Sequence, residues 1–421
     1  MVNTSTESTS TESTAVDTRS NEIRISDIPV LNEDPYSLEN LADPYPFMSR
    51  LRARGPAAWL SEYEVPAFGR DSEVREILED HRTFISGAGV GSVNIHHNPP
   101  LRKPGILEVD PPLHTRMRMA MDGVITPRKL RPRRKDFSTY AKTAIDEILS
   151  TENGEFDAAR LAEQYVLRVF GDAVGIPREG RAENLLVQGA ANFATFGPQN
   201  EVAKRWIAEA EGTYDWVLAN CAREVLDPSG MGAQLWEFAD SGEISPEEAT
   251  LLVRALLSAG LDTTIYAITN TLNTLARHPD QYAKIHADPR RMRFAIDESF
   301  RLESPFYAFY RTTSRDTVLS GVEIPAETKV LVFPGSANRD ETKWGDDADV
   351  YRYDRDSSGH LTFGMGIHQC VGQPISRMEM EAFLSAFVTR IASLEQTGPT
   401  ERLIHTTLQS YATVPLKAHA A

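Results

Sequence analysis

Apolar residues recur every three or four positions along most of the chain after residue 113, which is the spacing that places them on one face of an α-helix. These patterns predict helices over 113–124, 136–151, 157–174, 179–195, 200–223, 233–240, 246–278, 279–286, 289–301 and 371–394. Alternating patterns are few and short. They predict a hairpin over 57–69 and two strands joined by a turn over 316–324 and 329–333. The fold class that follows is mainly α with small β portions.

The first 22 residues differ in composition from the rest of the chain. They are rich in Ser, Thr and Glu, and such a segment has too little apolar surface to fold. We therefore expect residues 1–22 to form a disordered tail. No linker or internal repeat divides the remainder, so residues 23–421 are expected to form a single domain.

Composition and charge exclude several classes of protein. The 421 residues carry a formal net charge of −16, whereas nucleic-acid binders usually present a basic face. No run of 18 apolar residues occurs, so we expect no membrane span. The two cysteines, Cys221 and Cys370, do not make a secreted disulfide framework. The expected protein is cytoplasmic, with neither nucleic acid nor membrane as a partner.

The strongest chemical signal is the segment 363–372, which reads F-G-M-G-I-H-Q-C-V-G. Glycines let a backbone approach a flat ligand closely, and a cysteine at a helix N-terminus has its thiolate stabilised by the helix dipole. One thiolate suits an axial ligand of haem iron, whereas zinc needs four ligands at recognisable spacing. The alternative is that Cys370 is only a small buried residue, as we expect for Cys221.

This segment resembles the haem-ligand loop of the cytochrome P-450 family, in particular its soluble bacterial haem-thiolate monooxygenases. The resemblance implies the cytochrome P-450 fold, haem b with Cys370 on the iron, and O2 as a cosubstrate. It also implies electrons from NAD(P)H, delivered by a ferredoxin and a ferredoxin reductase, because the chain has no flavin or iron–sulfur domain of its own. A monomer is expected.

The predicted helix over 246–278 contains Ala259-Gly260-Leu261-Asp262-Thr263-Thr264. Gly, Asp and Thr are each unfavourable inside an apolar helix, so their combination favours a function. The segment matches the family's acid–alcohol pattern, which implies a widened helix groove where O2 fits, with Asp262 and Thr263 as the catalytic residues that manage protons. The alternative is a Thr that bonds back to the preceding turn.

Two further sets of residues match the family. His114 and Arg118, four residues apart in H-T-R-M-R, are implied to bind the haem propionates together with Arg311 and His368. The loop residues Phe363, Gly364 and Gly366 are implied to contact the haem. Glu298 and Arg301 lie on one helix face and match a structural triad whose third member is Arg355; their implied role is folding and haem incorporation.

Several stretches resemble a narrower group of the family that oxidises para-substituted benzoates such as 4-methoxybenzoate; they are 193–201, 252–254, 304–305, 309 and 334–340. The resemblance implies that Phe193, Phe196 and Phe309 sandwich a flat aromatic acid. Arg254 would supply charge near its carboxylate. The alternative, from the i, i+3 spacing alone, is that Phe193 and Phe196 pack in the core.

This chain departs from that group at two positions. Ala255 stands where a serine is expected, and Phe306 is larger than expected. Ser92 is the candidate to replace the lost hydroxyl, and Ala259 completes the expected substrate site. A para-alkyl phenol, guaiacol-type or cinnamate-type substrate stays open. So do a haem-binding sensor or electron carrier that does not oxygenate, and a peroxide-driven enzyme of the same fold.

A basic run stands out in this acidic chain; it comprises Arg128, Lys129, Arg131, Arg133, Arg134 and Lys135. One interpretation is a solvated loop. The other is a docking surface for an acidic ferredoxin, because complementary charge raises the rate of association.

Overall fold

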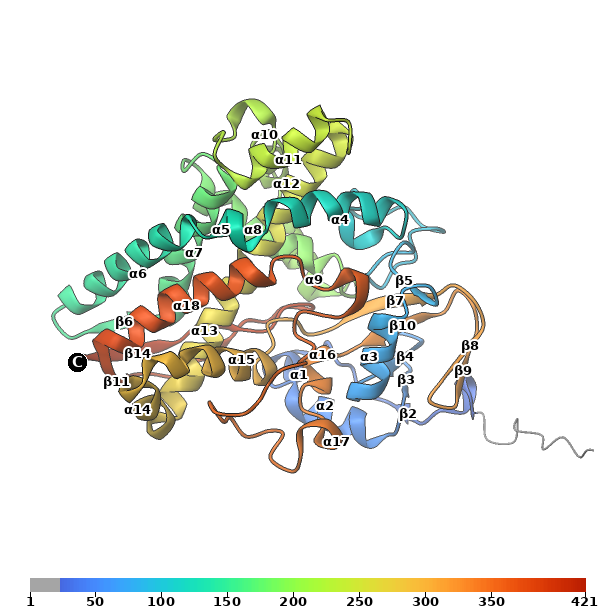
Figure 1. The fold of residues 1–421 in the computed structure, drawn as a ribbon. Coiled ribbons are helices and arrows are strands. Elements are labelled where there is room, and N and C mark those ends of the chain that lie inside the picture. The colour runs from blue at the N-terminus through green and yellow to red at the C-terminus, as the bar shows by residue number, and fades with distance from the viewer. Residues whose placement is uncertain (1–22) are drawn as a thin grey trace, which may run out of the picture.

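The computed structural model describes residues 23–421 (Figure 1). The predicted tail, residues 1–22, lies outside the described residues. The α-helices are α1 Leu38–Ala42, α2 Tyr45–Ala53, α3 Asp71–Glu79, α4 Leu113–Val124, α5 Pro127–Leu130, α6 Arg133–Ser150, α7 Ala158–Val174, α8 Arg181–Ala194, α9 Glu201–Glu209, α10 Thr213–Ala219, α11 Met231–Asp240, α12 Pro246–Gly260, α13 Asp262–Arg277, α14 Pro279–Ala287, α15 Met292–Leu302, α16 Pro334–Ala337, α17 Glu341–Trp344 and α18 Gln373–Arg390.

Within residues 23–421 the strands form four sheets. Their bounds are β1 Ile23–Arg24, β2 Val30–Leu31, β3 Ala58–Leu60, β4 Val65–Phe68, β5 Phe84–Ile85, β6 Glu155–Asp157, β7 Phe309–Thr313, β8 Thr317–Leu319, β9 Val322–Ile324, β10 Lys329–Val332, β11 Ile391–Gln396, β12 Glu401–Arg402, β13 Tyr411–Thr413 and β14 Pro415–Ala420. The largest sheet has the order β2-β3-β4-β10-β7-β5, in which β10 runs parallel to β4 and antiparallel to β7. The smaller sheets are β1-β9-β8, β11-β14-β6 and β12-β13.

The main hydrophobic core lies among the helices, and two smaller clusters cover the faces of the largest sheet. Helix α13 packs on α7, and α6 packs on α18; Figure 1 shows α6 and α18 side by side, with the largest sheet on the other side of the molecule. Residues 246–277 are long and apolar enough to span a membrane by length and composition. However, 67% of their most apolar stretch is buried inside the protein, where they form its central helices.

The predicted helix over 246–278 is interrupted. Helix α12 ends at Gly260 and α13 begins at Asp262, with φ −86° and ψ −69° at Leu261 between them. A Cβ at position 260 would lie 2.2 Å from the ring of Phe170, so the close packing of α7 requires glycine there. The break therefore falls at the segment that the sequence singled out for chemistry.

Three other predicted elements differ from the structure, for local or tertiary reasons. The helix predicted over 200–223 is divided into α9 and α10, because Gly212 adopts φ +85° between them. The helix predicted to reach residue 394 ends at Arg390, since the next six residues pair with β14 as strand β11. The strand predicted over 316–324 is itself the hairpin β8–β9. The hairpin predicted over 57–69 is confirmed as β3–β4.

Candidate active site

A large cavity lies between the helical core and the largest sheet. Its volume is about 270 Å³. The loop before α18 forms one side of the cavity and the α12–α13 junction forms another, so Cys370 and Thr263 line the same space. Residues from α4, α8 and β7 close the remaining sides.

A backbone hydrogen bond joins the two ends of the loop that carries Cys370. The backbone N–H of Cys370 donates to the carbonyl of Phe363 at 2.8 Å. Gly364 adopts φ +66°, and a Cβ built there would meet no atom of residues 23–421 within 4 Å. Because Gly364 and Phe363 line the cavity, this open space is room for a flat ligand. Gly366 does not line it; a Cβ there would lie 2.6 Å from the Leu78 carbonyl oxygen, so this glycine permits packing against α3.

Cys370 lines the cavity and is accessible from it, although protein surrounds the site on its other sides. Burial raises the pKa of its thiol, while the backbone N–H groups of Gly372 and Gln373 and the charge of Arg118 partly oppose the rise. Arg118 also donates to the carbonyls of Ile367 and Gln369, at 3.2 and 2.6 Å, and so fixes the loop. A nearby cation would stabilise a thiolate in this position, and an iron ion bound in the cavity would provide that charge.

A group of hydrogen-bond donors at the cavity edge, two of them the guanidinium groups of Arg311 and Arg118, has unused capacity for an anion. The buried guanidinium of Arg311 donates, within residues 23–421, only to the carbonyl of Tyr310 at 3.0 Å, and burial lowers its pKa to about 10. Burial and the charge of Arg311 lower the pKa of His368 to about 2, and its Nε2 has no partner within the same residues. The rings of His368 and His114 lie 4.2 Å apart. Together with Arg118, these residues fit the propionates of haem.

The helical wall of the cavity contains the predicted acid–alcohol pair, but its two members face different ways. Ala259, Gly260 and Thr263 line the cavity. The Thr263 hydroxyl donates to the carbonyl of Ala259 at 2.8 Å. This is the bond to the preceding turn that the sequence analysis gave as the alternative. Asp262 does not line the cavity; its side chain is buried on the other side of the helix.

Four phenylalanines form an aromatic wall of the cavity. Phe193 lies 5.8 Å from Phe196 and 5.7 Å from Phe306, and Phe306 lies 5.5 Å from Phe309, measured between ring centroids. All three pairs are edge-to-face, an arrangement that leaves ring faces and edges available to a further planar ring. The predicted aromatic residues are thus brought together, including Phe306.

Charged groups lie at the same end of the cavity. Arg254 is buried and donates to the Lys103 carbonyl at 2.7 Å and to the Tyr214 hydroxyl at 3.3 Å. Sequence reasoning missed a second cation, Arg102, which lies over the ring of Phe196 at 4.8 Å and pairs with Glu108 at 2.9 Å. Nothing in the local pattern marks Arg102, because its contact with Phe196 joins segments distant in sequence.

One predicted substrate residue is not brought to this site. Ser92 does not line the cavity, and its hydroxyl donates to the Gly197 carbonyl at 3.1 Å. The expectation that it replaces the hydroxyl absent at Ala255 is therefore wrong for this arrangement. Ala255 itself lines the cavity.

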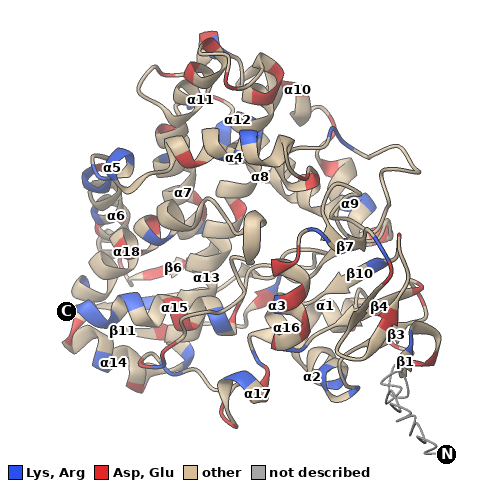
Figure 2. Cartoon of the chain, turned by 45° about the vertical axis from the view of Figure 1, so that its right-hand side comes forward, with Lys and Arg blue, Asp and Glu red and all other residues tan. Residues whose placement is uncertain are grey.

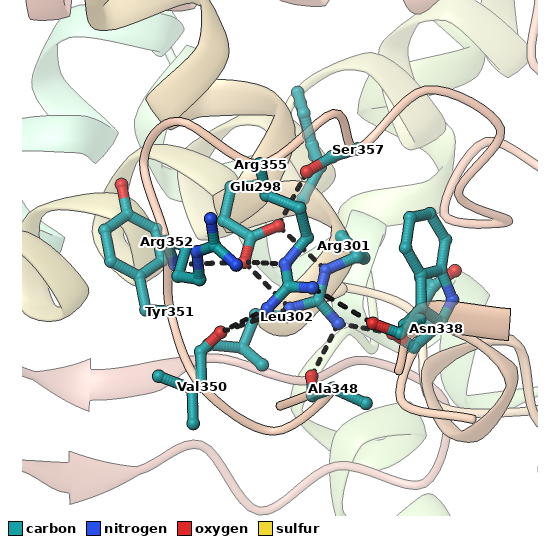
Figure 3. A network of polar contacts seen from close by, with 12 residues as sticks. Glu298, Arg301, Leu302, Asn338, Ala348, Val350, Tyr351, Arg352, Arg355 and Ser357 are labelled. Carbon is teal, nitrogen blue, oxygen red and sulfur yellow. Dashed lines mark hydrogen bonds and ion pairs between the residues drawn. The ribbon is translucent and has the colours of Figure 1, made fainter. Parts of the chain in front are cut away.

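The predicted structural triad forms a buried polar network (Figure 3). Glu298 accepts from Nε and Nη2 of Arg301, both at 2.8 Å, and from Nε of Arg355 at 3.1 Å. Arg301 also donates to the carbonyls of Asn338 and Ala348. The network therefore joins α15 to the chain that leads to the Cys370 loop.

The basic run lies on α5 and the start of α6 (Figure 2). Its six cationic residues are exposed except for Arg133, which is partly buried and donates to the Ser229 carbonyl at 2.7 Å. Arg134 pairs with Glu381 of α18 at 2.9 Å. Because α18 follows Cys370 directly, the basic run lies on the cysteine-bearing side of the cavity.

Comparison with known proteins agrees with this geometry. The cytochrome P450 family profile matches residues 230–408. Cytochrome P450 CYP199A2 of Rhodopseudomonas palustris is 44% identical over 392 residues, covering 93% of this chain and 94% of its own. Cytochrome P450 monooxygenase PikC of Streptomyces venezuelae is 30% identical over 385 residues, with 87% and 88% covered. The structure of cytochrome P450 CYP109Q5 from Chondromyces apiculatus matches with a TM-score of 0.77 and 27% identity, covering 94% of this chain and 99% of that one.

These findings confirm the predicted fold class, the haem cofactor and the use of O2 with NAD(P)H-derived electrons. Cys370 lies on one side of the cavity, hydrogen-bond donors without partners lie at its edge, and the α12–α13 junction lies on another side. The chain belongs to the cytochrome P450 family and is a haem-thiolate monooxygenase.

Proposed function

We propose that this monooxygenase hydroxylates or O-demethylates a small para-substituted aromatic acid, with 4-methoxybenzoate as the first candidate. The observation that carries the proposal is the aromatic wall of four phenylalanines beside Arg254 in one cavity with Cys370. A flat ring fits between such side chains through edge and face contacts.

The charge balance at this end of the cavity favours an anionic substrate. Glu108 neutralises Arg102, whereas Arg254 has no carboxylate partner among residues 23–421. A buried guanidinium without a counter-ion is costly, and a substrate carboxylate would relieve that cost. Bidentate binding of a carboxylate is the geometry that Arg provides best.

A second candidate is a neutral guaiacol-type or para-alkyl phenol. It is favoured by Ala255, which brings no hydroxyl to the cavity, and by the bulk of Phe306. Losing one hydrogen bond to a carboxylate costs about 1 kcal/mol net, or more if the charge stays unpaired. The choice between acid and phenol therefore depends on whether Arg254 anchors the acid without a neighbouring hydroxyl.

Bound haem would supply the iron that activates O2 for transfer of one oxygen atom to the substrate. Cys370 would hold that iron, and Arg311, His368, His114 and Arg118 would hold the propionates. Thr263 places a hydroxyl group in the cavity. This hydroxyl donates its proton to the Ala259 carbonyl, so its oxygen is free to accept a hydrogen bond. Asp262, the preceding residue, would resupply protons. The aromatic wall excludes water from the substrate.

Electrons would arrive from a ferredoxin, reduced by a ferredoxin reductase, at the basic run on α5 and α6. Reversing the charge of Arg131 and Arg134 should slow reduction by an acidic ferredoxin and flatten its dependence on salt. Stopped-flow reduction at several ionic strengths measures both. An unchanged rate and salt slope would reject this docking surface.

The monomeric state, the single domain over 23–421 and the cytoplasmic location stay predictions.

The test of the proposed reaction is product analysis with the reconstituted redox chain. With 4-methoxybenzoate, one O2, two electrons and two protons should yield 4-hydroxybenzoate, formaldehyde and water. Turnover of 4-propylguaiacol alone would instead support the phenol alternative. Oxygenated product from neither, with full reduction of the iron, would favour a sensor or an electron carrier, and turnover with H2O2 alone would reveal a peroxide-driven enzyme.

A further inference from the structure

Two rings of the aromatic wall, Phe193 and Phe306, come from distant parts of the chain. Phe193 lies in the last turn of α8, whereas Phe306 lies in the segment that joins α15 to β7. The rings stand edge to face with their centroids 5.7 Å apart. Because such a pair is favourable only at a particular separation and angle, the relative position of the two backbones determines the shape of the wall.

A turn between β12 and β13, residues 403–410, joins these two backbones. The Thr407 hydroxyl donates to the Phe193 carbonyl at 2.8 Å, and the Thr407 carbonyl accepts from the Tyr307 N–H at 2.7 Å. Phe193 is one of the last four residues of α8, whose carbonyls lack the helical donor four residues further on. Thr407, which is fully buried, therefore holds α8 through its side chain and the segment before β7 through its main chain.

The pairing on the Phe306 side is a short stretch of antiparallel sheet. Phe306 forms an isolated antiparallel bridge with Leu408, and the Gln409 N–H donates to the Pro305 carbonyl at 2.9 Å. Leu408 is buried in one hydrophobic cluster with Phe193, and Phe306 packs against that cluster. The backbone of Phe306 is thus fixed against the turn on both sides of the residue.

His405 fixes the conformation of the turn and adds a second bond to α8. Its Nδ1 accepts the backbone N–H groups of Thr407 and Leu408 at 3.0 and 3.1 Å. The ring proton therefore lies on Nε2, which donates to the Ala190 carbonyl at 2.9 Å. Burial lowers the pKa of His405 to about 4, so the neutral ring that this pattern requires is the stable form at neutral pH. Ala190 and Phe193 are three residues apart on one face of α8, so both bonds hold the same face.

We propose that Thr407 is a specificity-determining positioning residue of this monooxygenase, whose bonds to Phe193 and Tyr307 set the spacing of the aromatic wall and hence which planar substrates fit. Among residues 23–421, Phe193 and Phe306 line the cavity and Thr407 does not. Thr407 therefore acts through these side chains without touching the substrate. The selection of aromatic substrates rests on the proposed function, whereas the fixing of the two rings does not.

A set of three variants separates this role from a general loss of stability. Thr407→Val keeps the shape of the side chain and removes the hydroxyl, whereas Thr407→Ser keeps the hydroxyl. The matched control is Thr271→Val. Thr271 is equally buried, and its hydroxyl donates to the Ala267 carbonyl at 2.7 Å, but that bond joins two residues of α13. Both valine variants lose one buried hydrogen bond, so a difference between them at the site reports where the bond was lost.

The first experiment needs no substrate. The holoenzyme labelled with 4-fluorophenylalanine is examined by fluorine NMR as its diamagnetic reduced CO complex, with two signals assigned from Phe193→Leu and Phe306→Leu. Thr407→Val should shift or broaden both signals, whereas Thr407→Ser and Thr271→Val should leave them at their wild-type positions. Unchanged signals in Thr407→Val, or equal changes in Thr271→Val, would overturn the proposal.

The second experiment compares two acids of equal charge, so that the contribution of Arg254 to binding is shared. Titration of the Soret band gives the dissociation constants of 4-methoxybenzoate and 3-methoxybenzoate. The preference for the para isomer should fall about fivefold in Thr407→Val, the factor that corresponds to one hydrogen bond of ordinary net strength. It should keep its wild-type value in Thr407→Ser and Thr271→Val.

The outcomes distinguish this proposal from the proposed function. A wild-type preference in Thr407→Val, with both acids bound, would refute the role of Thr407 in specificity. If neither acid shifts the Soret band of the wild type, the proposed reaction with aromatic acids fails, and the fluorine spectra still decide whether Thr407 positions the wall.

Discussion

The buried network around Glu298 allows a quantitative prediction for the variant Glu298→Gln. The carboxylate is 0% exposed and accepts from Arg301, Arg355, the Ser357 hydroxyl at 2.6 Å and the Arg352 backbone N–H at 3.1 Å. The substitution keeps the shape of the side chain but leaves two guanidinium groups with no buried counter-charge. Breaking a buried ion pair in this way costs about 3–5 kcal/mol.

This free energy converts to a shift in melting temperature. Unfolding entropy near 60 °C is about 2.1 cal/mol/K per residue, or roughly 0.9 kcal/mol/K for a chain of this length. The expected decrease in Tm is therefore about 3–6 °C. Calorimetry of the purified holoenzyme measures it, and the haem content of the same preparation should fall because the network leads to the Cys370 loop.

A matched control exists on the surface. Glu201 and Lys204 form a pair with the same i, i+3 spacing and nearly the same length, 2.9 Å against 2.8 Å, but their side chains are 92% and 61% exposed. Glu201→Gln should melt within about 1 °C of the wild type, since exposed pairs contribute little. Equal melting temperatures for Glu298→Gln and Glu201→Gln would refute the reasoning.

Three further predictions follow from the site and its surroundings. Cys370→Ala should abolish the haem-thiolate absorption of the reduced CO complex and all turnover; a retained thiolate spectrum would mean that Cys370 is not the ligand. Thr263→Ala should keep NADH consumption but divert it to peroxide, measured as product formed per NADH, and tight coupling would count against its role. Lys329 donates to the carbonyls of Ala88 and Gly89, and burial and then the charge of Arg311 lower its pKa to about 7. The unfolded chain keeps this proton up to about pH 10, so the stability of the folded protein should rise as pH increases above 7. The Tm of the wild type minus that of Lys329→Met should therefore increase from pH 7 to 9. A constant difference would contradict the lowered pKa of Lys329.

Residues close together in sequence were the predictable part of the site. The ten residues around Cys370 and the segment 259–264 carry their chemistry in local order, so both were found without a structure. The same holds for the hairpin 57–69, whose alternation is local. The network of Glu298 was recognisable only because the Cys370 loop gave its weak i, i+3 pattern a context.

Features that depend on distant contacts were not predictable. The glycine at position 260, beside the break at Leu261, is required by Phe170 of a neighbouring helix, which no pattern within the helix reveals. Arg102 belongs to the site because it contacts Phe196. Ser92 lies outside the site, where its hydroxyl bonds to the Gly197 carbonyl. The direction of Asp262, opposite to that of Thr263, follows from the packing of α8. In each case a tertiary contact decides what the local sequence leaves open.

Selection of an aromatic acid depends on Arg254 and the aromatic wall. The most direct test is titration of the purified holoenzyme with 4-methoxybenzoate, 4-methylphenol and 4-propylguaiacol while the Soret band is recorded. We expect a large low-to-high-spin shift with the acid, and its loss in Arg254→Gln. A shift with the phenols alone would contradict it and would mean that the same cavity serves a neutral aromatic substrate.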